Sequence, residues 1–188
     1  MLKPGDLAMD LGANMGEITT ILAETGADVV AFEPDPYAFE KLKKRFQNAP
    51  NVTLVNAAVG ASEGTVKLMR AENFNENPKG ASVKSTILDG GRSIDAGNFI
   101  EVPLLDFLTI VDTEVKKRGE IAFVKMDIEG AELEILETMH AQDKSGQIRS
   151  LVAETHERKL RDLRPRFKAL RQAVAEAYPA HKVNLEWI

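Results

Sequence analysis

The sequence predicts an α/β protein with a mostly parallel central sheet and helices on both faces of that sheet. Short runs of β-branched and other apolar residues alternate with longer segments in which apolar residues recur at helical spacing. A glycine-rich turn follows the first apolar run, and polar residues follow several later runs. This alternation is typical of doubly wound sheets, which bind ligands beyond the carboxyl ends of their strands. We therefore expect a Rossmann-like fold.

The length and composition of the chain fit one domain that spans residues 1–188. Hydrophobic residues make up 44% of the sequence and charged residues 28%. Cysteine is absent, which excludes disulfides, thiolate zinc sites and cysteine nucleophiles and is compatible with a reducing compartment. The net charge of -5 argues against nucleic acid as a partner. The sequence has no apolar run long enough to span a bilayer and no signal-peptide pattern, so we expect a cytoplasmic protein without a membrane partner.

The first half of the chain shows regular alternation of strands and helices. The first helix is expected to end at Gly26, and the second presents Ala38, Leu42 and Phe46 on one apolar face. A turn at 61–64 precedes a further strand. The strands expected in this half cover residues 6–11, 28–33, 52–58 and 65–69.

Residues 70–98 interrupt this alternation. The segment is rich in Asn, Gly, Ser and charged residues and has little periodicity. A loop of this length inside a compact domain is usually functional or disordered. We expect a mobile lid or an acceptor-binding loop.

The alternation resumes in the second half. Leu105, Leu108, Val111 and Val115 predict one helix, a second is expected around residues 133–139, and the last is expected to start at Pro165. The strands expected in this half cover residues 121–126, 148–153 and 183–188.

Polar residues follow five of the expected core strands, at the edge where a doubly wound sheet binds its ligand. Glycines in the first turn let a ligand lie against bare backbone, beside the positive start of a helix. A single acid after the second strand is suited to accept two ribose hydroxyls, and a polar residue followed by a small one after the third suits an adenine. The residues in question are Asp10-x-Gly12-x-Asn14-x-Gly16, Glu33, Asn56-Ala57, Asp127-Ile128-Glu129 and Glu154-Thr155-His156.

Dinucleotide binding is the main alternative, because Glu33 follows Gly12 at about the spacing of a ribose-binding acid. The dinucleotide fingerprint requires a second glycine where this chain has Asn14, whose side chain would crowd a pyrophosphate. The acids Asp10 and Asp127 suit a cationic ligand such as S-adenosylmethionine and would repel a pyrophosphate. An NAD(P)-dependent oxidoreductase and a noncatalytic module that binds S-adenosylmethionine remain as alternatives.

Four motifs together resemble the FkbM family of methyltransferases. They are Asp10-Leu-Gly-Ala-Asn-Met-Gly16, Ala31-Phe-Glu-Pro-Asp-Pro36, Asn56-Ala-Ala-Val-Gly60 and Val124-Lys-Met-Asp-Ile-Glu-Gly-Ala-Glu132. The resemblance implies a class I methyltransferase fold with S-adenosylmethionine as cofactor. It also implies O-methylation of a hydroxyl on a sugar, a polyketide or another small molecule.

The resemblance implies a role for each motif in the cofactor site. Glu33, next to Pro34, would take the ribose hydroxyls, and Asp127 and Glu129 would sit beside the transferring methyl group. The loop at 10–16 would hold the methionine part of the cofactor. The family motifs thus assign cofactor contacts to Asp10, Gly12, Ala13, Asn14, Gly16, Glu33, Pro34, Asn56, Ala57 and Asp127.

Transfer to a hydroxyl also needs a group that accepts its proton. Glu129 and Glu154 are the favoured bases, His156 is a further candidate, and Asp127 is expected nearer the sulfonium. We assign no metal ligand, because the three histidines show no HxxxH or HxH spacing. Oxygen ligands from Asp127 and Glu154 would nevertheless suit Mg²⁺.

Overall fold

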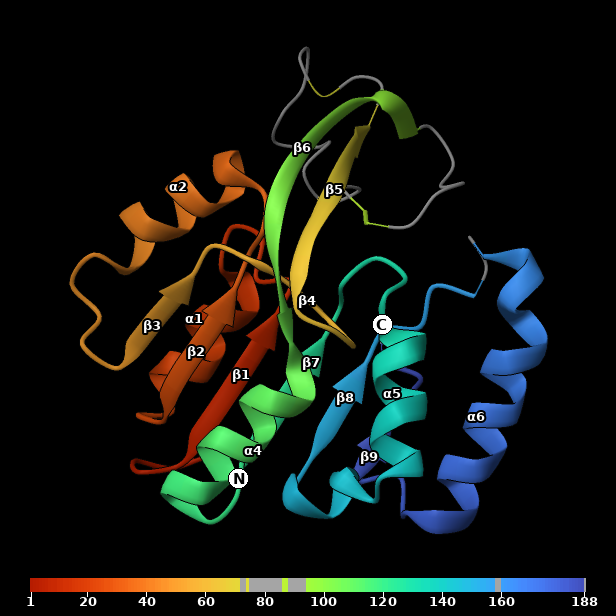
Figure 1. Cartoon of the computed structure of the whole chain (residues 1–188). Helices are drawn as coiled ribbons and strands as arrows, with labels where there is room; N and C mark the ends of the chain where they lie inside the picture. Colours follow the sequence, from red (N-terminus) through yellow and green to blue (C-terminus); the bar gives the residue numbers. More distant parts are fainter. Residues whose placement is uncertain (72–73, 75–85, 88–93, 158–159, 188) are drawn as a thin grey trace.

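The computed structural model of the chain describes residues 1–71, 74, 86–87, 94–157 and 160–187 (Figure 1). Its main sheet has six described strands in the order β3-β2-β1-β7-β8-β9, and every neighbouring pair is parallel. The order reverses between β1 and β7, which is the switch point where doubly wound sheets bind ligands. The predicted fold class is confirmed. The strands are β1 Leu7–Leu11, β2 Asp28–Phe32, β3 Val52–Val55, β7 Phe123–Met126, β8 Leu151–Ala153 and β9 Val183–Asn184.

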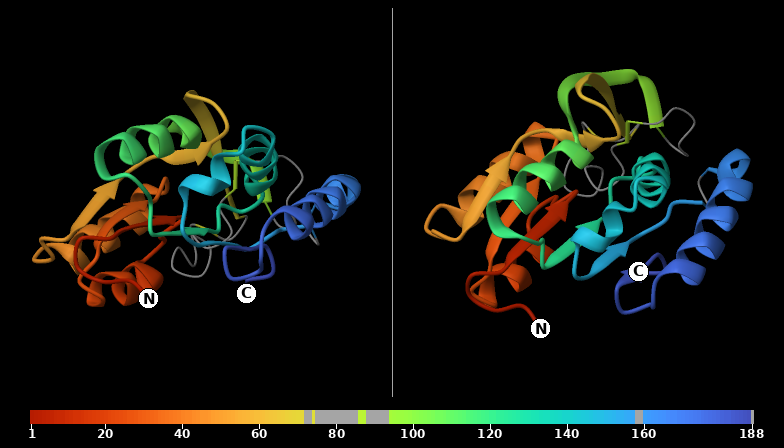
Figure 2. Two further views of the ribbon diagram at one scale, coloured as in Figure 1. Left: turned by 90° about the horizontal axis from the view of Figure 1, so that it is seen from below. Right: turned by 60° about the horizontal axis from the view of Figure 1, so that its bottom comes forward.

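Helices cover both faces of this sheet. Helix α1 lies on one face, α4 and α5 lie on the opposite face, and α6 packs along α5 (Figure 2). Helix α2 shares an apolar cluster with β2 and α1. The helices are α1 Glu17–Glu24, α2 Pro36–Phe46, α4 Phe107–Arg118, α5 Glu132–Ala141 and α6 Arg164–Ala177, with short 3₁₀ turns at η2 Lys144–Gln147 and η3 Arg161–Leu163.

Acidic caps fix where α2 and α4 begin. Asp35 accepts a hydrogen bond from the backbone N–H of Tyr37 at 2.8 Å, and Pro36 occupies the first turn of α2. Asp106 accepts from the backbone N–H groups that open α4. The Asp35 cap holds α2 close to the end of β2, and the Asp106 cap starts α4 directly after β6.

A second sheet rises beyond the carboxyl ends of the parallel strands (Figure 1). It comprises β4 Ala58–Gly60, β5 Gly64–Ala71 and β6 Ile94–Asp106, in the order β4-β6-β5. Strand β6 pairs parallel with β4 and antiparallel with β5.

This second sheet corrects three sequence predictions. The strand expected at 52–58 is two strands, because the Asn56 side chain donates to the backbone oxygens of Glu33 and Pro34 and turns the chain away from β2. Leu105 lies in β6, so the helix expected from it begins at Phe107. The segment at 70–98 is not a loop throughout, because its first two residues belong to β5 and its last five to β6. The rest of the expected lid lies mostly outside the described residues.

The strands of the second half are shorter than predicted. Only an isolated bridge between Ile121 and Ile148 precedes β7 and β8, so the two strands begin later than expected. Strand β9 ends at Asn184, whose side-chain oxygen accepts the backbone N–H of Glu186 at 2.9 Å and bends the chain.

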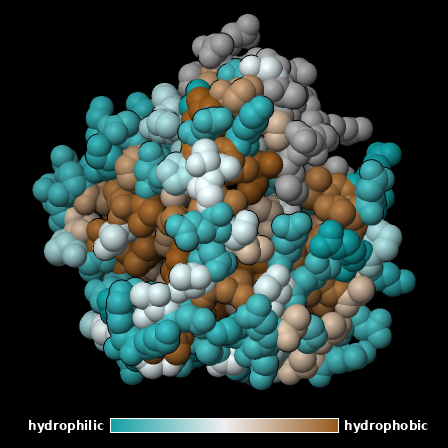
Figure 3. Space-filling model, viewed as in Figure 1, coloured by the Kyte–Doolittle hydropathy of each residue, from teal (hydrophilic) through white to brown (hydrophobic). Residues whose placement is uncertain are grey.

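The main core lies between the sheet and the helices α4, α5 and α6. Phe107 and Phe167 are fully buried in it together with β1 and β7 side chains. Figure 3 shows hydrophobic residues on the part of the surface beside α4. Val30 and Val55 pack against the main core and remain partly exposed. Within the described part of the chain, no helix has the length and apolar character needed to cross a membrane.

Candidate functional site

A cavity opens at the carboxyl ends of the parallel strands, between the main sheet and the second sheet. Its apolar wall comes from both sheets and includes Phe32, Val59, Leu68 and Ile87. Another part of its wall brings together most of the residues that the sequence placed at strand ends. These are Gly12, Asn14, Glu33, Pro34, Ala57, Asp127 and Glu129.

The remaining predicted site residues do not line this cavity. Asp10 is fully buried beneath it, and its carboxylate accepts a 2.6 Å hydrogen bond from the Thr19 hydroxyl. Asn56 is exposed, with its amide committed to the turn after β3. Three others stand near the cavity without forming its wall, namely Ala13, Gly16 and Glu154.

The glycines of the first turn serve the packing of the protein as well as the cavity. Gly12 has a φ of 77°, and a Cβ there would lie 1.8 Å from the backbone oxygen of Asp127. Gly16 has a φ of 85° at the start of α1, and a Cβ there would lie 2.5 Å from the Phe46 ring. Side chains at either position would push apart the elements that form the cavity.

Glu33 is held rigidly at the end of β2. One carboxylate oxygen accepts the backbone N–H of Asn14 at 2.7 Å, and the other accepts that of Asp35 at 2.8 Å. Asn14 reaches this position with a left-handed φ of 47°. Burial raises the pKa of Glu33 to about 7, although the two N–H groups favour the ionised form. Each oxygen keeps a lone pair for a further donor in the cavity.

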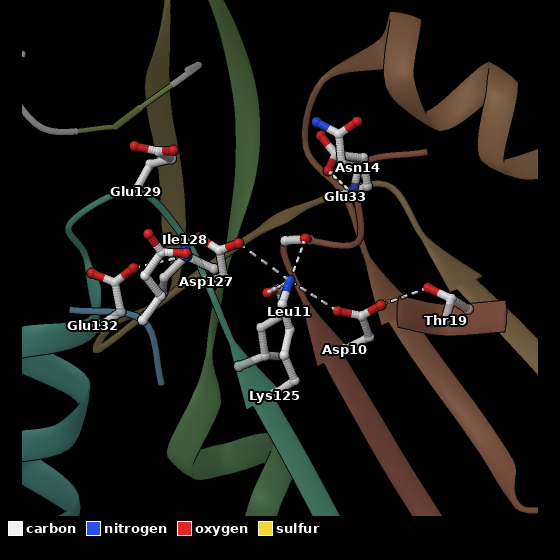
Figure 4. A network of polar contacts seen from close by, with 12 residues as sticks. Asp10, Leu11, Asn14, Thr19, Glu33, Lys125, Asp127, Ile128, Glu129 and Glu132 are labelled. Carbon is white, nitrogen blue, oxygen red and sulfur yellow. Dashed lines mark hydrogen bonds and ion pairs between the residues drawn. The ribbon is translucent and has the colours of Figure 1, made fainter. Parts of the chain in front are cut away.

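Lys125 on β7 ties the two central strands together beneath the cavity (Figure 4). Its ammonium donates to the backbone oxygens of Gly12 at 2.8 Å and Leu11 at 3.3 Å. It also lies 3.2 Å from Asp10 and 3.7 Å from Asp127. The side chain is 4% exposed, so this ammonium supplies the positive charge that buried carboxylates need.

His156 lies among four carboxylates after β7 and β8. Its Nδ1 is 3.1 Å from Glu132 on α5. Its Nε2 faces Glu129, Asp127 and Glu154 at distances of 3.5, 3.7 and 3.7 Å. Asp127, Glu129 and His156 each offer one atom within 4.8 Å of the others, so the three residues could hold a metal ion.

The charges of this cluster shift its proton equilibria. Burial lowers the pKa of His156, but hydrogen bonds and attraction to Glu129 and Glu132 outweigh it and raise that pKa to about 10. At neutral pH this raised pKa favours the protonated form of the ring. Burial raises the pKa of Asp127, against the influence of Lys125.

Glu129 is directed toward the cavity by an unusual backbone conformation. Its φ is 58°, which is uncommon for a residue with a side chain, and the following Gly130 has a φ of 114°. Its backbone oxygen accepts a 2.7 Å hydrogen bond from Thr86, which pairs with Met69 of β5. The second sheet thus supports the loop that presents this carboxylate.

The sequence did not predict the residues that hold other site residues in place or complete the cavity wall. Lys125 stands inside an otherwise apolar strand run, and that mismatch was the available signal. Glu132 belonged to the quoted motif, but only the fold shows that it contacts His156. The wall supplied by Leu68 and Ile87 required knowledge of the second sheet.

Comparison with known proteins gives matches among methyltransferases. Residues 10–178 match the model of the methyltransferase FkbM domain. The hexuronic acid methyltransferase AglP of Haloferax volcanii is 28% identical over 138 residues, covering 71% of this chain and 50% of AglP. The 31-O-demethyl-FK506 methyltransferase FkbM of Streptomyces tacrolimicus is 26% identical over 178 residues, covering 83% of this chain and 67% of the relative.

A solved structure is also similar. The methyltransferase FkbM of Methylobacillus flagellatus is 19% identical, with a TM-score of 0.48 over 80% of this chain and 34% of that chain. The matched part of this chain thus spans half to two thirds of the two curated relatives. The family model covers nearly all of the sequence, from Asp10 in β1 to Tyr178, the residue after α6. The chain belongs to the methyltransferase FkbM domain family.

Proposed function

We propose that this protein is an S-adenosylmethionine-dependent O-methyltransferase that acts on a hydroxyl of a sugar, a polyketide or another small molecule. The observation that carries the proposal is one cavity with a fixed carboxylate, Glu33, on one side and a cluster of acids on the other. Family membership and the named substrates of AglP and FkbM support the substrate class.

Several residues of the cavity wall suit individual parts of S-adenosylmethionine, which supports the proposal. Glu33 has a free lone pair on each oxygen, and both can accept ribose hydroxyls without disturbing the bonds that hold the side chain. Phe32, Ala57 and Ile87 offer an apolar surface for the adenine. Asp127 places negative charge at the opposite wall, where it would attract the sulfonium and ammonium groups.

S-adenosylmethionine supplies a methyl group on a positively charged sulfur. The protein aligns the acceptor oxygen with that methyl carbon, and such positioning contributes about 7–11 kcal/mol in favourable systems. As the new C–O bond forms, the C–S bond breaks and its electron pair goes to sulfur. The hydroxyl proton goes to a carboxylate, either Glu129 on the cavity wall or Glu154 beside it.

We also infer that the acceptor is a small molecule and that the protein acts in the cytoplasm. The negative net charge and the acidic rim would repel nucleic acid and anionic membrane surfaces. The methyl acceptor is thus expected among free hydroxylated metabolites.

Two measurements test the proposed function. Calorimetric titration with S-adenosylmethionine and with NAD is expected to show binding of the former alone. Transfer of a labelled methyl group to a panel of sugars, hexuronic acids and polyketide alcohols is expected to identify the acceptor. Binding of NAD in preference to S-adenosylmethionine would refute the assignment, and cofactor binding without transfer to any acceptor would favour a noncatalytic module.

A further inference from the structure

We propose that Asp127, Glu129 and His156 bind a divalent metal ion at the wall of the cavity. The three residues come from two loops that follow the neighbouring parallel strands β7 and β8. Asp127 and Glu129 also line the cavity, so a bound ion would face the space where the acceptor enters. That placement relative to the acceptor rests on the proposed function, whereas the ion-binding site itself does not.

The distances from the Nε2 atom of His156 to two carboxylates of the cluster are close to those between neighbouring ligands of one ion. An N–H···O hydrogen bond spans about 2.7–3.2 Å. Neighbouring ligand atoms that each lie about 2.1–2.2 Å from a metal ion are separated by about 3.0–3.6 Å. The Nε2 atom of His156 lies 3.5 Å from Glu129 and 3.7 Å from Asp127. Small rotations of the two carboxylates would complete the coordination.

The orientation of His156 provides a second, independent observation. Histidines that bind metals usually donate the N–H of their other ring nitrogen to a carboxylate, which fixes the tautomer. Here Nδ1 lies 3.1 Å from Glu132, and the same Glu132 oxygen accepts the backbone N–H of Ile128 at 2.8 Å. The imidazole is 3% exposed, so Nε2 is fixed toward the cluster. An ion bound at Nε2 would take the place of any proton there, as metal binding to histidine requires.

The charge of the site also favours a divalent ion. Three carboxylates, those of Asp127, Glu129 and Glu154, face the Nε2 atom of one imidazole. Carboxylates suit Mg²⁺ and Mn²⁺, and the imidazole adds preference for a first-row ion. We therefore assign the site to an ion of the Mn²⁺ class. With Asp127 and Glu129 as ligands, Glu154 remains as the carboxylate that takes the acceptor proton.

The test measures Mn²⁺ binding by the whole protein through the electron paramagnetic resonance signal of free Mn²⁺. The wild type is expected to bind one ion, and Glu129→Gln or His156→Gln to weaken binding at least about tenfold. Glu132→Gln keeps all three ligands and is expected to weaken binding by about 10–100-fold through loss of the Nδ1 acceptor. Glu134→Gln removes the same charge from the solvent side of α5 and should bind like the wild type.

Circular dichroism and thermal melting show which variants fold. If His156→Gln does not fold, Glu129→Gln decides, since that side chain lies at the cavity wall and is 18% exposed. Equal Mn²⁺ binding by the wild type and folded Glu129→Gln, or no binding by the wild type at millimolar protein, would overturn the inference. Calorimetry with S-adenosylmethionine on the same samples keeps this outcome separate from the failure of the proposed function.

Discussion

Glu33 and the acids after β7 and β8 face one cavity from two sides, but their surroundings differ. Glu33 is 5% exposed and receives two backbone N–H groups at 2.7 and 2.8 Å. Asp127, Glu129 and Glu154 are 18–39% exposed and approach His156 no closer than 3.5 Å. Backbone N–H groups thus hold Glu33 in one position. The three acids on the other side make longer contacts with the imidazole of His156. We therefore call the side with Glu33 the binding half of the cavity, and the side with Asp127, Glu129 and Glu154 its reacting half.

Lys125 connects the two halves, and its removal should produce the largest effect. Lys125→Met keeps the length of the side chain but leaves buried Asp10 without its cation. Breaking a buried ion pair costs about 3–5 kcal/mol of stability, which urea denaturation would measure. The control Lys117→Met removes an exposed pair with Glu114 and should change stability by less than about 1 kcal/mol. Equal effects of the two substitutions would show that Lys125 does not tie the strands together.

The reacting half is tested by amide substitutions that keep the shape of the side chains. If Glu154 accepts the hydroxyl proton, Glu154→Gln should lower kcat by about 10²-fold and leave the dissociation constant of S-adenosylmethionine nearly unchanged. Single-turnover rates and calorimetry measure the two quantities. Glu129→Gln should also lower kcat, whether Glu129 is the base or a metal ligand. Full activity in both variants would show that neither Glu129 nor Glu154 accepts the hydroxyl proton.

The binding half is tested by Glu33→Ala. Loss of charge-assisted hydrogen bonds to the ribose should weaken S-adenosylmethionine by about 1.5–3 kcal/mol, or about 10–150-fold. The substitution should lower the affinity for S-adenosylmethionine and leave the rate at saturating cofactor nearly unchanged. An unchanged dissociation constant in a folded variant would remove Glu33 from the cofactor site.

The sequence predicted the residues at strand ends but not the contacts that these residues make in the fold. Strand ends are local features, so Glu33, Asp127 and Glu129 could be placed at one edge of the sheet before the fold was known. Asp10 was expected there too, but its role depends on Thr19 and Lys125, which contact it only in the folded chain.

The sequence could not predict contacts between residues that lie far apart along the chain. None of the three histidines has a spaced partner in the sequence, which offered only Asp127 and Glu154 as possible Mg²⁺ ligands, whereas in the fold two loops and a helix bring four carboxylates around His156. Strand β6 was also missed, because its N-terminal part reads as Gly- and Asn-containing loop and its stability comes from pairing with β4 and β5. Without β6, which lies between β4 and β5, the sheet that places Val59 and Leu68 in the cavity wall could not be assembled from the sequence.

The smallest expected effect is a pH dependence that should run in opposite directions for binding and for stability. Burial raises the pKa of Glu33 from 4.5 to about 7, so in the empty protein the carboxyl is largely protonated at pH 6. Only the ionised form accepts two ribose hydroxyls, so the affinity for S-adenosylmethionine should rise with pH up to about 7 and then level off. At pH 6 it should be about tenfold weaker than its plateau value.

Stability of the empty protein should change the other way over the same range. A carboxyl with a raised pKa in the folded state contributes stability that is fully present below pH 4.5 and is lost as the pH rises through about 7. Glu33→Gln cannot titrate, so the difference between wild type and variant isolates this group from His156, whose raised pKa also makes stability fall as the pH rises above about 6.5. Calorimetric affinities and urea denaturation between pH 5 and 8 measure both slopes. Parallel pH profiles for the wild type and Glu33→Gln in both measurements would show that Glu33 stays ionised, because the backbone N–H groups would then outweigh its burial.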